Sequence, residues 1–172
     1  MPNILVRRAR PDDVAAMVAL VHELAAYERE PQSCTLTADE LAAALFVPDA
    51  ALFAHVGEVD GEVVGTAIWF LNYSTWTGTH GVWLEDLFVR PSHRRHGLGR
   101  ALLTALAALC VERGYRRLEW TVLDWNTPAL DFYASLDAVA QDEWTTHRVT
   151  GPALTALALT PPGASPPPPP AR

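Results

Sequence analysis

The stretch RPSHRRHGLGRALL, residues 90–103, joins an apolar run typical of a β-strand to an apolar run typical of a helix. Arg94, Gly97 and Gly99 stand in it at the spacing R-x-x-G-x-G. Such strand-to-helix loops are where open α/β sheets bind ligands. Glycines let successive backbone N–H groups converge on an anion, and the start of the helix adds partial positive charge. We therefore expect a diphosphate site, although a glycine-rich turn with solvated arginines is the alternative that this loop alone leaves open.

Two common nucleotide-binding fingerprints are missing from the sequence, since it contains neither G-x-x-x-x-G-K-[ST] nor G-x-G-x-x-G. Kinases and dehydrogenases are accordingly disfavoured. The formal net charge of −7 disfavours a nucleic-acid partner, because phosphate backbones require clustered positive charge. The six histidines show no zinc-type ligand spacing, so no metal is expected.

The 172 residues favour one domain over residues 1–160, followed by a disordered Pro-rich tail over residues 161–172. No apolar stretch approaches the roughly 20 residues that a membrane-spanning helix needs. The N-terminus does not resemble a signal peptide. Two cysteines, Cys34 and Cys110, fit a reducing compartment, and Cys110 fits core packing better than catalysis. We therefore expect a cytoplasmic protein without a membrane partner.

The pattern of apolar residues predicts alternating strands and helices. Thr37 and Glu40 form a capping-box sequence at a helix start, and Asp60-Gly61 is typical of a hairpin turn. Strands are predicted near residues 4–8, in two runs on either side of residues 60–61, and over residues 82–89, 116–123 and 138–149. Helices are predicted over residues 14–27, 38–46, 98–113 and 129–136. Residues 72–81 are predicted to form a polar loop outside the strands, a polar excursion from the sheet. The order predicts an α/β sheet of mixed strand direction.

Four short sequence motifs occur in a fixed order along the chain, and together they are more specific than any one of them. They are Tyr27-Glu28 after the first helix, LEDLFV over residues 84–89, R-x-x-G-x-G over residues 94–99, and Trp125-Asn126 followed by Phe132-Tyr133. The chain resembles the GCN5-related N-acetyltransferase (GNAT) superfamily over residues 3–159. Within it, the chain is most similar to the diamine acetyltransferases of the spermidine/spermine type and their thialysine-acetylating relatives. The resemblance implies a GNAT fold with splayed central strands that bind CoA, and acetyl transfer from acetyl-CoA to a primary amine.

The resemblance also implies which residues hold acetyl-CoA. Backbone groups of one strand would pair with the pantetheine amides, and an N–H there would stabilise an oxyanion. His96 is equally well a solvated loop residue, and Asn126 is equally well a helix cap. The implied cofactor-binding residues are Leu87, Phe88, Val89, Arg94, Arg95, His96, Gly97, Leu98, Gly99, Arg100, Asn126 and Tyr133.

Two side chains are predicted to be catalytic. A lysine-like amine has a solution pKa near 10.4 and must lose a proton before it attacks. The resemblance assigns the base to Glu85, whose pKa burial in the apolar strand would raise. Asp86 would point to the opposite face of the strand unless a bulge intervenes. Tyr133 would protonate the departing thiolate. The structural alternative for Glu85 and Asp86 is a carboxylate at the sheet edge that bonds to backbone or arginine. The structural alternative for Tyr133 is an aromatic residue packed on the sheet.

The substrate is expected to be a small amine bound by Tyr27, Glu28, Trp76, Glu85 and Asp86. The loop before LED reads Tyr73-Ser74-Thr75-Trp76 and lacks the acidic residue of the spermidine/spermine enzymes, which shifts the expectation towards thialysine, lysine-like amino acids or small diamines. Asp137 stands where the family commonly has glycine. A homodimer is implied by the resemblance. An acyl-CoA-binding sensor and a protein-directed acetyltransferase are the alternative functions.

Overall fold

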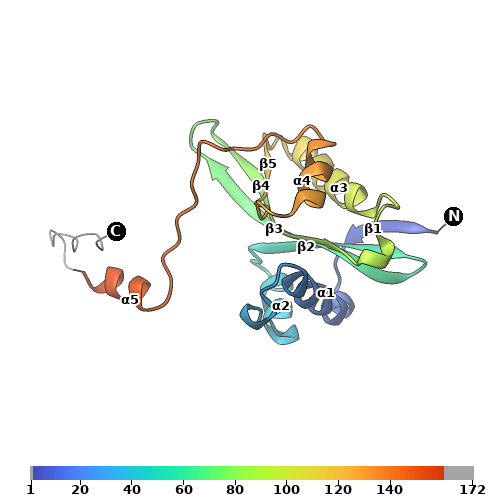
Figure 1. Cartoon of the computed structure of the whole chain (residues 1–172), viewed down its shortest axis with the longest axis horizontal. Helices are drawn as coiled ribbons and strands as arrows, with labels where there is room; N and C mark the ends of the chain where they lie inside the picture. Colours follow the sequence, from blue (N-terminus) through green and yellow to red (C-terminus); the bar gives the residue numbers. More distant parts are fainter. Residues whose placement is uncertain (1, 161–172) are drawn as a thin grey trace. The chain divides into compact units, whose positions relative to one another are not determined.

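The computed structural model describes residues 2–160 and contains one five-stranded sheet with the strand order β1-β2-β3-β4-β5 (Figure 1). β1 to β4 pair antiparallel, and β4 and β5 pair parallel. The strands are β1 (Ile4–Arg8), β2 (Leu52–Val59), β3 (Glu62–Ser74), β4 (Thr79–Val89) and β5 (Leu118–Glu119). The predicted α/β sheet of mixed direction is therefore confirmed.

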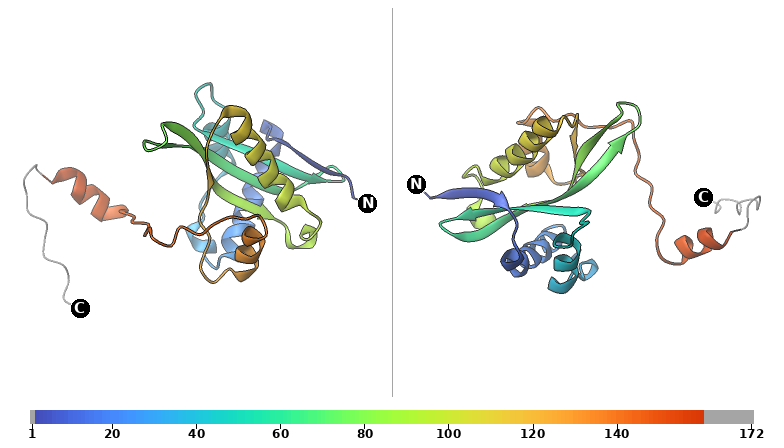
Figure 2. Two further views of the ribbon diagram at one scale, coloured as in Figure 1. Left: turned by 90° about the horizontal axis from the view of Figure 1, so that it is seen from above. Right: turned by 180° about the vertical axis from the view of Figure 1, so that it is seen from behind.

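Helices cover both faces of this sheet. α1 (Val14–Tyr27) and α2 (Ala38–Leu45) pack on one face, and α3 (Leu98–Arg113) packs on the other (Figures 1 and 2). The core between α1, α2 and the sheet consists of Val14, Met17, Leu41, Leu45, Ala54, Val56 and Ile68. On α3, Leu98, Leu102 and Leu106 are buried, as is Cys110, whose predicted role in packing is confirmed. The apolar face of each helix thus meets the sheet as its periodicity predicts.

Two glycines allow the start of α3 to approach the sheet closely. A Cβ at Gly57 would lie 2.6 Å from Leu98 Cδ1, and one at Gly65 would lie 3.3 Å from Leu98 Cδ2. Leu98 is only 1% exposed. Close packing of this side chain fixes the position of the loop that precedes α3.

The start of α2 and the turn between β2 and β3 form as their local sequences predict. Glu40 N–H donates to Thr37 Oγ1 at 3.3 Å, and Thr37 N–H donates to Glu40 Oε2 at 2.9 Å, so the capping box is confirmed. The β2–β3 hairpin turns at Asp60 and Gly61, with φ values of 52° and 88°. Positive φ at both residues is what a two-residue hairpin turn requires.

Two predicted boundaries in the sheet were wrong. Residues 72–81 are not a polar excursion, because β3 and β4 continue into this segment and pair as far as Ser74 and Thr79. The predicted strand over residues 116–123 shrinks to Leu118–Glu119. Strand length depends on how far a neighbouring strand stays within hydrogen-bonding distance, and residue patterns do not carry that information.

Contacts divide the chain into two units, and residues from Asp124 onward form the second. This unit contains α4 (Thr127–Ala134) and α5 (Gly151–Leu159). The strand predicted over residues 138–149 was wrong, since these residues form no strand pair, and the helix that follows was not predicted. Asp137 adopts a φ of 59°, which aspartate tolerates better than most residues. The predicted Pro-rich tail lies outside the described residues.

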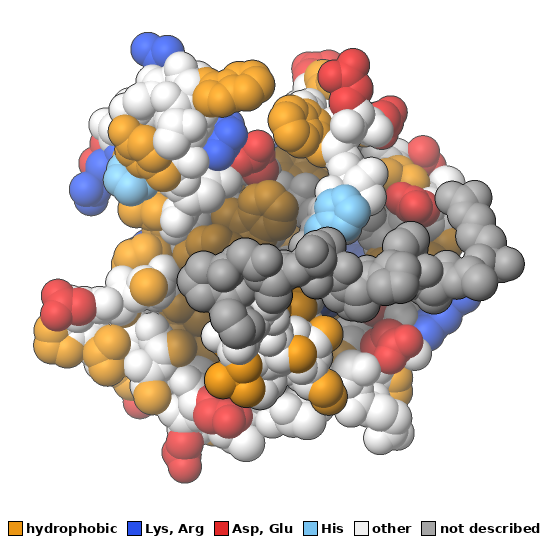
Figure 3. All heavy atoms as spheres, turned by 90° about the vertical axis from the view of Figure 1, so that its left-hand side faces the viewer, with side chains coloured by type: hydrophobic (Ala, Val, Ile, Leu, Met, Phe, Trp, Pro, Cys, Tyr) orange, Lys and Arg blue, Asp and Glu red, His pale blue; other side chains and the backbone are white. Residues whose placement is uncertain are grey.

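Apolar side chains are exposed in the second unit. Figure 3 shows hydrophobic side chains standing among charged ones on the face seen there. The exposed apolar residues of the second unit are Trp125, Leu130, Val139, Trp144, Val149, Leu154, Leu157 and Leu159. Within residues 2–160, none of the helices has the length and apolar character needed to cross a bilayer.

Candidate active site

The edge of β4 that faces β5 is open over half its length. β4 pairs with β5 only at Val82 and Trp83, so the strands part from Leu84 onward. On its other side β4 remains paired with β3 as far as Val89. The predicted splay of the two strands is confirmed, and it leaves those backbone groups of this segment that point away from β3 facing an open edge, where a strand-like ligand can be added.

The register decides which of these backbone groups face the open edge. Arg90 N–H donates to Val64 O at 2.9 Å, so residue 90 faces β3. Because the backbone groups of a strand alternate in direction, Phe88 also faces β3, whereas Leu87 and Val89 face the open edge. The expectation for Phe88 is thereby corrected, since its backbone is occupied within the sheet and its side chain is buried.

A β-bulge interrupts β4 at the acidic pair. Ile68 pairs with Asp86 and Trp69 pairs with Leu84, which leaves Glu85 as the extra residue. A bulge breaks the alternation of side chains along the strand. Asp86 and Glu85 are therefore close enough for the charge of Glu85 to raise the pKa of Asp86. The expected separation of the two carboxylates onto opposite faces required an uninterrupted strand, and the bulge removes that condition.

The more buried carboxylate of the pair is Asp86, which is half-buried. Glu85 is exposed and accepts a hydrogen bond of 3.0 Å from Trp83 Nε1, so the expectation that Glu85 is buried was wrong. Burial, with smaller contributions from the charges of Glu85 and Glu28, raises the pKa of Asp86 to about 6. The group that titrates near neutrality is thus one residue further along the strand than the sequence suggested.

Glu28, just after α1, completes an acidic cluster with this pair. Burial raises the pKa of Glu28, and its charge contributes to the raised pKa of Asp86. Carboxylates from two distant segments of sequence therefore act electrostatically on Asp86 at the bulge. Such a cluster attracts a cationic group and holds a proton acceptor beside it. We refer to Glu28, Glu85 and Asp86 as the acidic cluster.

Arg94 ties the glycine-containing loop to β4 and α1. Its guanidinium lies 4.7 Å from the ring centroid of Tyr27 and 5.3 Å from that of Phe88. Its Nε donates to Val89 O at 2.8 Å. Tyr27, predicted to bind substrate, thus contacts the loop arginine. Aromatic stacking of this kind holds the guanidinium plane while leaving its edge able to donate hydrogen bonds.

The loop after Arg94 fits a diphosphate. Arg95 and Gly97 adopt positive φ values of 63° and 87°, and Gly97 is the N-cap of α3. The first N–H groups of a helix have no partner within it, and such turns are typical of anion cradles. Nothing lies within 4 Å of a Cβ built on Gly97, so the space in front of the cradle is open. Because the Leu98 side chain is buried, only its backbone is available to a ligand.

The remaining loop side chains are exposed, and so is Trp76. Arg95, His96 and Arg100 are exposed around the start of α3, and Gly99 is half-buried. Trp76 is 90% exposed in the turn between β3 and β4. Its place in the substrate site stays a prediction.

The two predicted residues of the second unit lie at either end of α4. Asn126 is its N-cap residue and is buried, but its side chain makes no capping hydrogen bond, so the capping alternative is not supported. Its carbonyl oxygen accepts from the N–H groups of Ala129 and Leu130. Tyr133 is half-buried beside Phe132, with ring centroids 5.4 Å apart. The catalytic role of Tyr133 stays a prediction.

Comparisons with known proteins agree with this geometry. The family described as "Acetyltransferase (GNAT) family" matches residues 17–137. A thialysine N-epsilon-acetyltransferase of Caenorhabditis elegans is 34% identical over 92% of this chain and 99% of that protein. An L-ornithine N5-acetyltransferase of Arabidopsis thaliana is 31% identical over 88% of this chain and 86% of that protein.

A solved structure supports the fold independently. An integron cassette protein from the mobile metagenome of V. cholerae superimposes with a TM-score of 0.76 at 24% identity, over 91% of this chain and 98% of that one. GNAT acetyltransferases use acetyl-CoA, and the open edge of β4 together with the loop at Gly97 provides the features that such a ligand needs. The family match, the relatives and the fold together show that the chain belongs to the GNAT family of acetyltransferases.

Proposed function

We propose that this acetyltransferase acts on the primary amine of a small molecule, with lysine-like amino acids as the favoured class. The observation that carries the proposal is the acidic cluster, which lies at the bulge of β4 beside the open edge. A cationic amine is attracted to such carboxylates, and one of them can then take its proton. Acetyl-CoA supplies the acetyl group as a thioester.

Acetyl-CoA would be held by three parts of the chain. The backbone groups of Leu87 and the N–H of Val89 on the open edge suit the pantetheine amides, in the manner of an added strand, whereas the carbonyl oxygen of Val89 accepts from Arg94. The N–H groups at the start of α3 suit the diphosphate, and Arg95 and Arg100 lie on the same loop and helix start. Arg94 holds this loop against β4. Asn126 is proposed to hydrogen-bond the pantetheine arm, and His96 to contact a phosphate.

The proton acceptor is proposed to be Asp86, with Glu85 as its partner. A pKa of about 6 is close to the working range of a general base, whereas exposed Glu85 is suited to attracting the ammonium group. This assignment moves the base by one residue from the position implied by the family resemblance. Tyr133 is proposed to donate its phenolic proton to the departing sulfur, as predicted from the sequence.

The pH profile distinguishes the two carboxylates. A base works when deprotonated, so kcat/KM of the parent should rise through an inflection near pH 6. Asp86→Asn should remove this inflection and lower the rate by about 10²- to 10⁴-fold. Glu85→Gln should keep the inflection and move it to lower pH, because a negative charge that raises the pKa of Asp86 is gone. Initial rates between pH 5 and 8 measure both effects. An inflection lost in Glu85→Gln and kept in Asp86→Asn would return the base to Glu85.

The favoured amine is short. The named relatives acetylate thialysine and ornithine, which are amino acids with a side-chain amine. The turn from Ser74 to Trp76 offers no carboxylate for the far end of a long polyamine.

Acetyl-CoA-dependent thiol release tests the function across thialysine, lysine, ornithine, putrescine, spermidine and a lysine-containing peptide. Thialysine, lysine or ornithine should give the highest kcat/KM. A preference for spermidine would overturn the substrate class, and a preference for the peptide would indicate a protein-directed enzyme. No turnover of any amine, with acetyl-CoA still bound in calorimetry, would favour a sensor.

We infer further that the protein is a cytoplasmic homodimer. Exposed apolar side chains on α5, including Leu154 and Leu157, are typical of a surface that packs against a partner. Cys34 and Cys110 are both free thiols, as in a reducing compartment. Sedimentation analysis should give twice the chain mass, and a monomer at micromolar concentration would contradict the assembly. Recovery in a membrane or secreted fraction of cells would contradict the location.

A further inference from the structure

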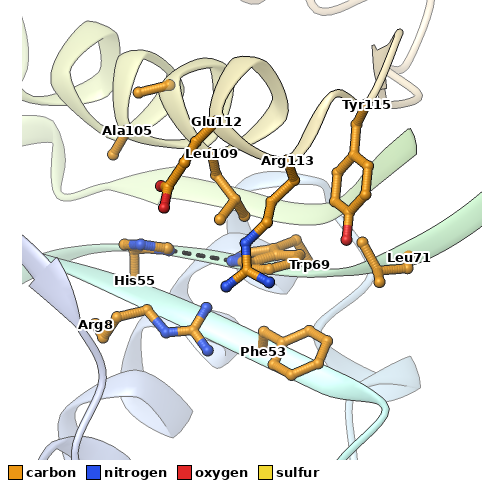
Figure 4. Close-up of a pocket in the computed structure, with 11 residues that line it drawn as sticks. Arg8, Phe53, His55, Trp69, Leu71, Ala105, Leu109, Glu112, Arg113 and Tyr115 are labelled. Atoms are coloured by element: carbon orange, nitrogen blue, oxygen red, sulfur yellow. Dashed lines mark hydrogen bonds between the residues drawn. The ribbon is translucent and has the colours of Figure 1, made fainter. Parts of the chain in front are cut away.

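A second concave site lies on the face of the sheet covered by α3. It is a cleft of about 530 Å³ between the C-terminal half of α3 and strands β1, β2 and β3 (Figure 4). This volume is within the range of small-molecule sites. The α3 residues of the cleft begin at Ala105, whereas the proposed diphosphate cradle is at Gly97, before the helix. From Leu98 to Ala105 the helix rises by about 10 Å, so the cleft is separate from the cradle.

Two arginines reach the cleft from opposite sides. Arg8 comes from β1 and Arg113 comes from the last turn of α3, and both side chains point into the space between them (Figure 4). Within residues 2–160 neither guanidinium forms an ion pair, although Glu112 also lines the cleft. Burial lowers the pKa of Arg8, and the nearby positive charge of Arg113 lowers it further. Paired guanidiniums without a carboxylate between them are suited to an added anion.

The floor of the cleft is aromatic. The rings of Phe53 and Trp69 lie 4.7 Å apart between centroids, and the guanidinium of Arg8 lies 5.3 Å from each ring centroid. Trp69 Nε1 donates to His55 Nδ1 at 3.1 Å, and both residues are buried. This bond requires an unprotonated Nδ1, and burial with the charge of Arg8 lowers the pKa of His55 to about 4. His55 is therefore neutral, and the positive charge of the cleft comes from the two arginines.

We propose that this cleft binds a small aromatic carboxylate, at a site separate from the acetyl-transfer site. The carboxylate would lie between the guanidiniums of Arg8 and Arg113, which can each donate two parallel hydrogen bonds. The flat ring would pack against the half-buried ring of Phe53 and against the aliphatic side chain of Leu109. A ligand of this cleft therefore needs a negative charge for the two arginines and a flat ring for the apolar side chains.

Calorimetric titration with phenylacetate tests the proposal on the full chain. We expect a dissociation constant on the order of 0.1–1 mM, as suits a ligand of this size. Phenethylamine, which replaces the anion by a cation, and acetate, which lacks the ring, should each bind at least about 10-fold more weakly. Saturating acetyl-CoA should leave phenylacetate binding unchanged. Absence of phenylacetate binding, equal binding of phenethylamine, or displacement by acetyl-CoA would overturn the proposal.

Matched variants locate the binding. Ala108 lines the cleft and Ala107 does not, and both are exposed on α3. Ala108→Trp should abolish phenylacetate binding by filling the cleft, and Ala107→Trp should leave it unchanged. Arg113→Gln should weaken binding by about 10- to 100-fold, because a charge-assisted hydrogen bond is lost, whereas Arg116→Gln, an exposed residue outside the cleft, should not. Unaltered binding in both Ala108→Trp and Arg113→Gln would reject this location.

Discussion

Gly97→Glu is expected to lower the affinity for acetyl-CoA by about 1,000-fold. The glutamate would place a negative charge and a side chain in the open space in front of the α3 start, where the diphosphate is proposed to lie. Two like charges about 4 Å apart near a protein surface repel by about 4 kcal/mol. That energy corresponds to about three orders of magnitude in affinity. Calorimetric titration of acetyl-CoA into both proteins measures the change.

Gly61→Glu is the matched control for this substitution. Gly61 has a φ of 88°, almost the same as the 87° of Gly97, and a Cβ at either position meets nothing within 4 Å. Both variants therefore add the same charge and a similar backbone strain. Gly61 lies in the β2–β3 turn, so its substitution should leave acetyl-CoA affinity unchanged. Tight binding by Gly97→Glu would show that the loop does not hold the diphosphate.

Tyr133→Phe is expected to lower kcat by about 10- to 10,000-fold, the range of general acid catalysis. The substitution removes one oxygen and keeps the ring that lies beside Phe132. The affinity for acetyl-CoA should stay nearly constant, because the role proposed for the hydroxyl is exercised only as the sulfur departs. Steady-state rates and calorimetric binding on the same preparations separate the two effects.

Ser135→Ala controls for disturbance of the helix that carries Tyr133. The Ser135 hydroxyl donates to Phe132 O at 2.6 Å at the end of α4. Its loss removes a hydroxyl from the same end of α4 and leaves the phenol of the proposed acid in place, so kcat should change by less than about twofold. Equal kcat in Tyr133→Phe and the parent would remove Tyr133 from the mechanism. Equal losses in both variants would indicate a structural role.

Local sequence signals predicted the elements that depend on neighbouring residues. The capping box of Thr37 and Glu40 and the turn at Asp60-Gly61 act over two to four residues, so the chain needs no tertiary partner to express them. The helix over residues 98–113 is confirmed at both ends, with Gly97 before it and Gly114 in the left-handed conformation after it. The helix at Gly151–Leu159 had a comparable signal in Thr150 followed by Pro152, which is typical of a helix start.

The strands were less predictable because their pairing is not local. The apolar pattern over residues 116–123 and 138–149 is compatible with a strand, but a strand forms only where a neighbouring backbone meets it. β4 diverges from β5 after Trp83, which ends the first of these early. Within residues 2–160, no strand meets residues 138–149.

The sequence by itself determined the family-defining motifs, the first four α-helices and the glycine-containing loop, because each depends on residue type and short spacing. Only the tertiary structure decided the chemistry of the acidic cluster. The bulge that makes Glu85 an extra residue depends on the register between β3 and β4, and the approach of Glu28 depends on the packing of α1. These long-range contacts leave Asp86 half-buried and Glu85 exposed. Desolvation and neighbouring charges set a pKa, so the carboxylate that titrates near neutrality was known only from the fold.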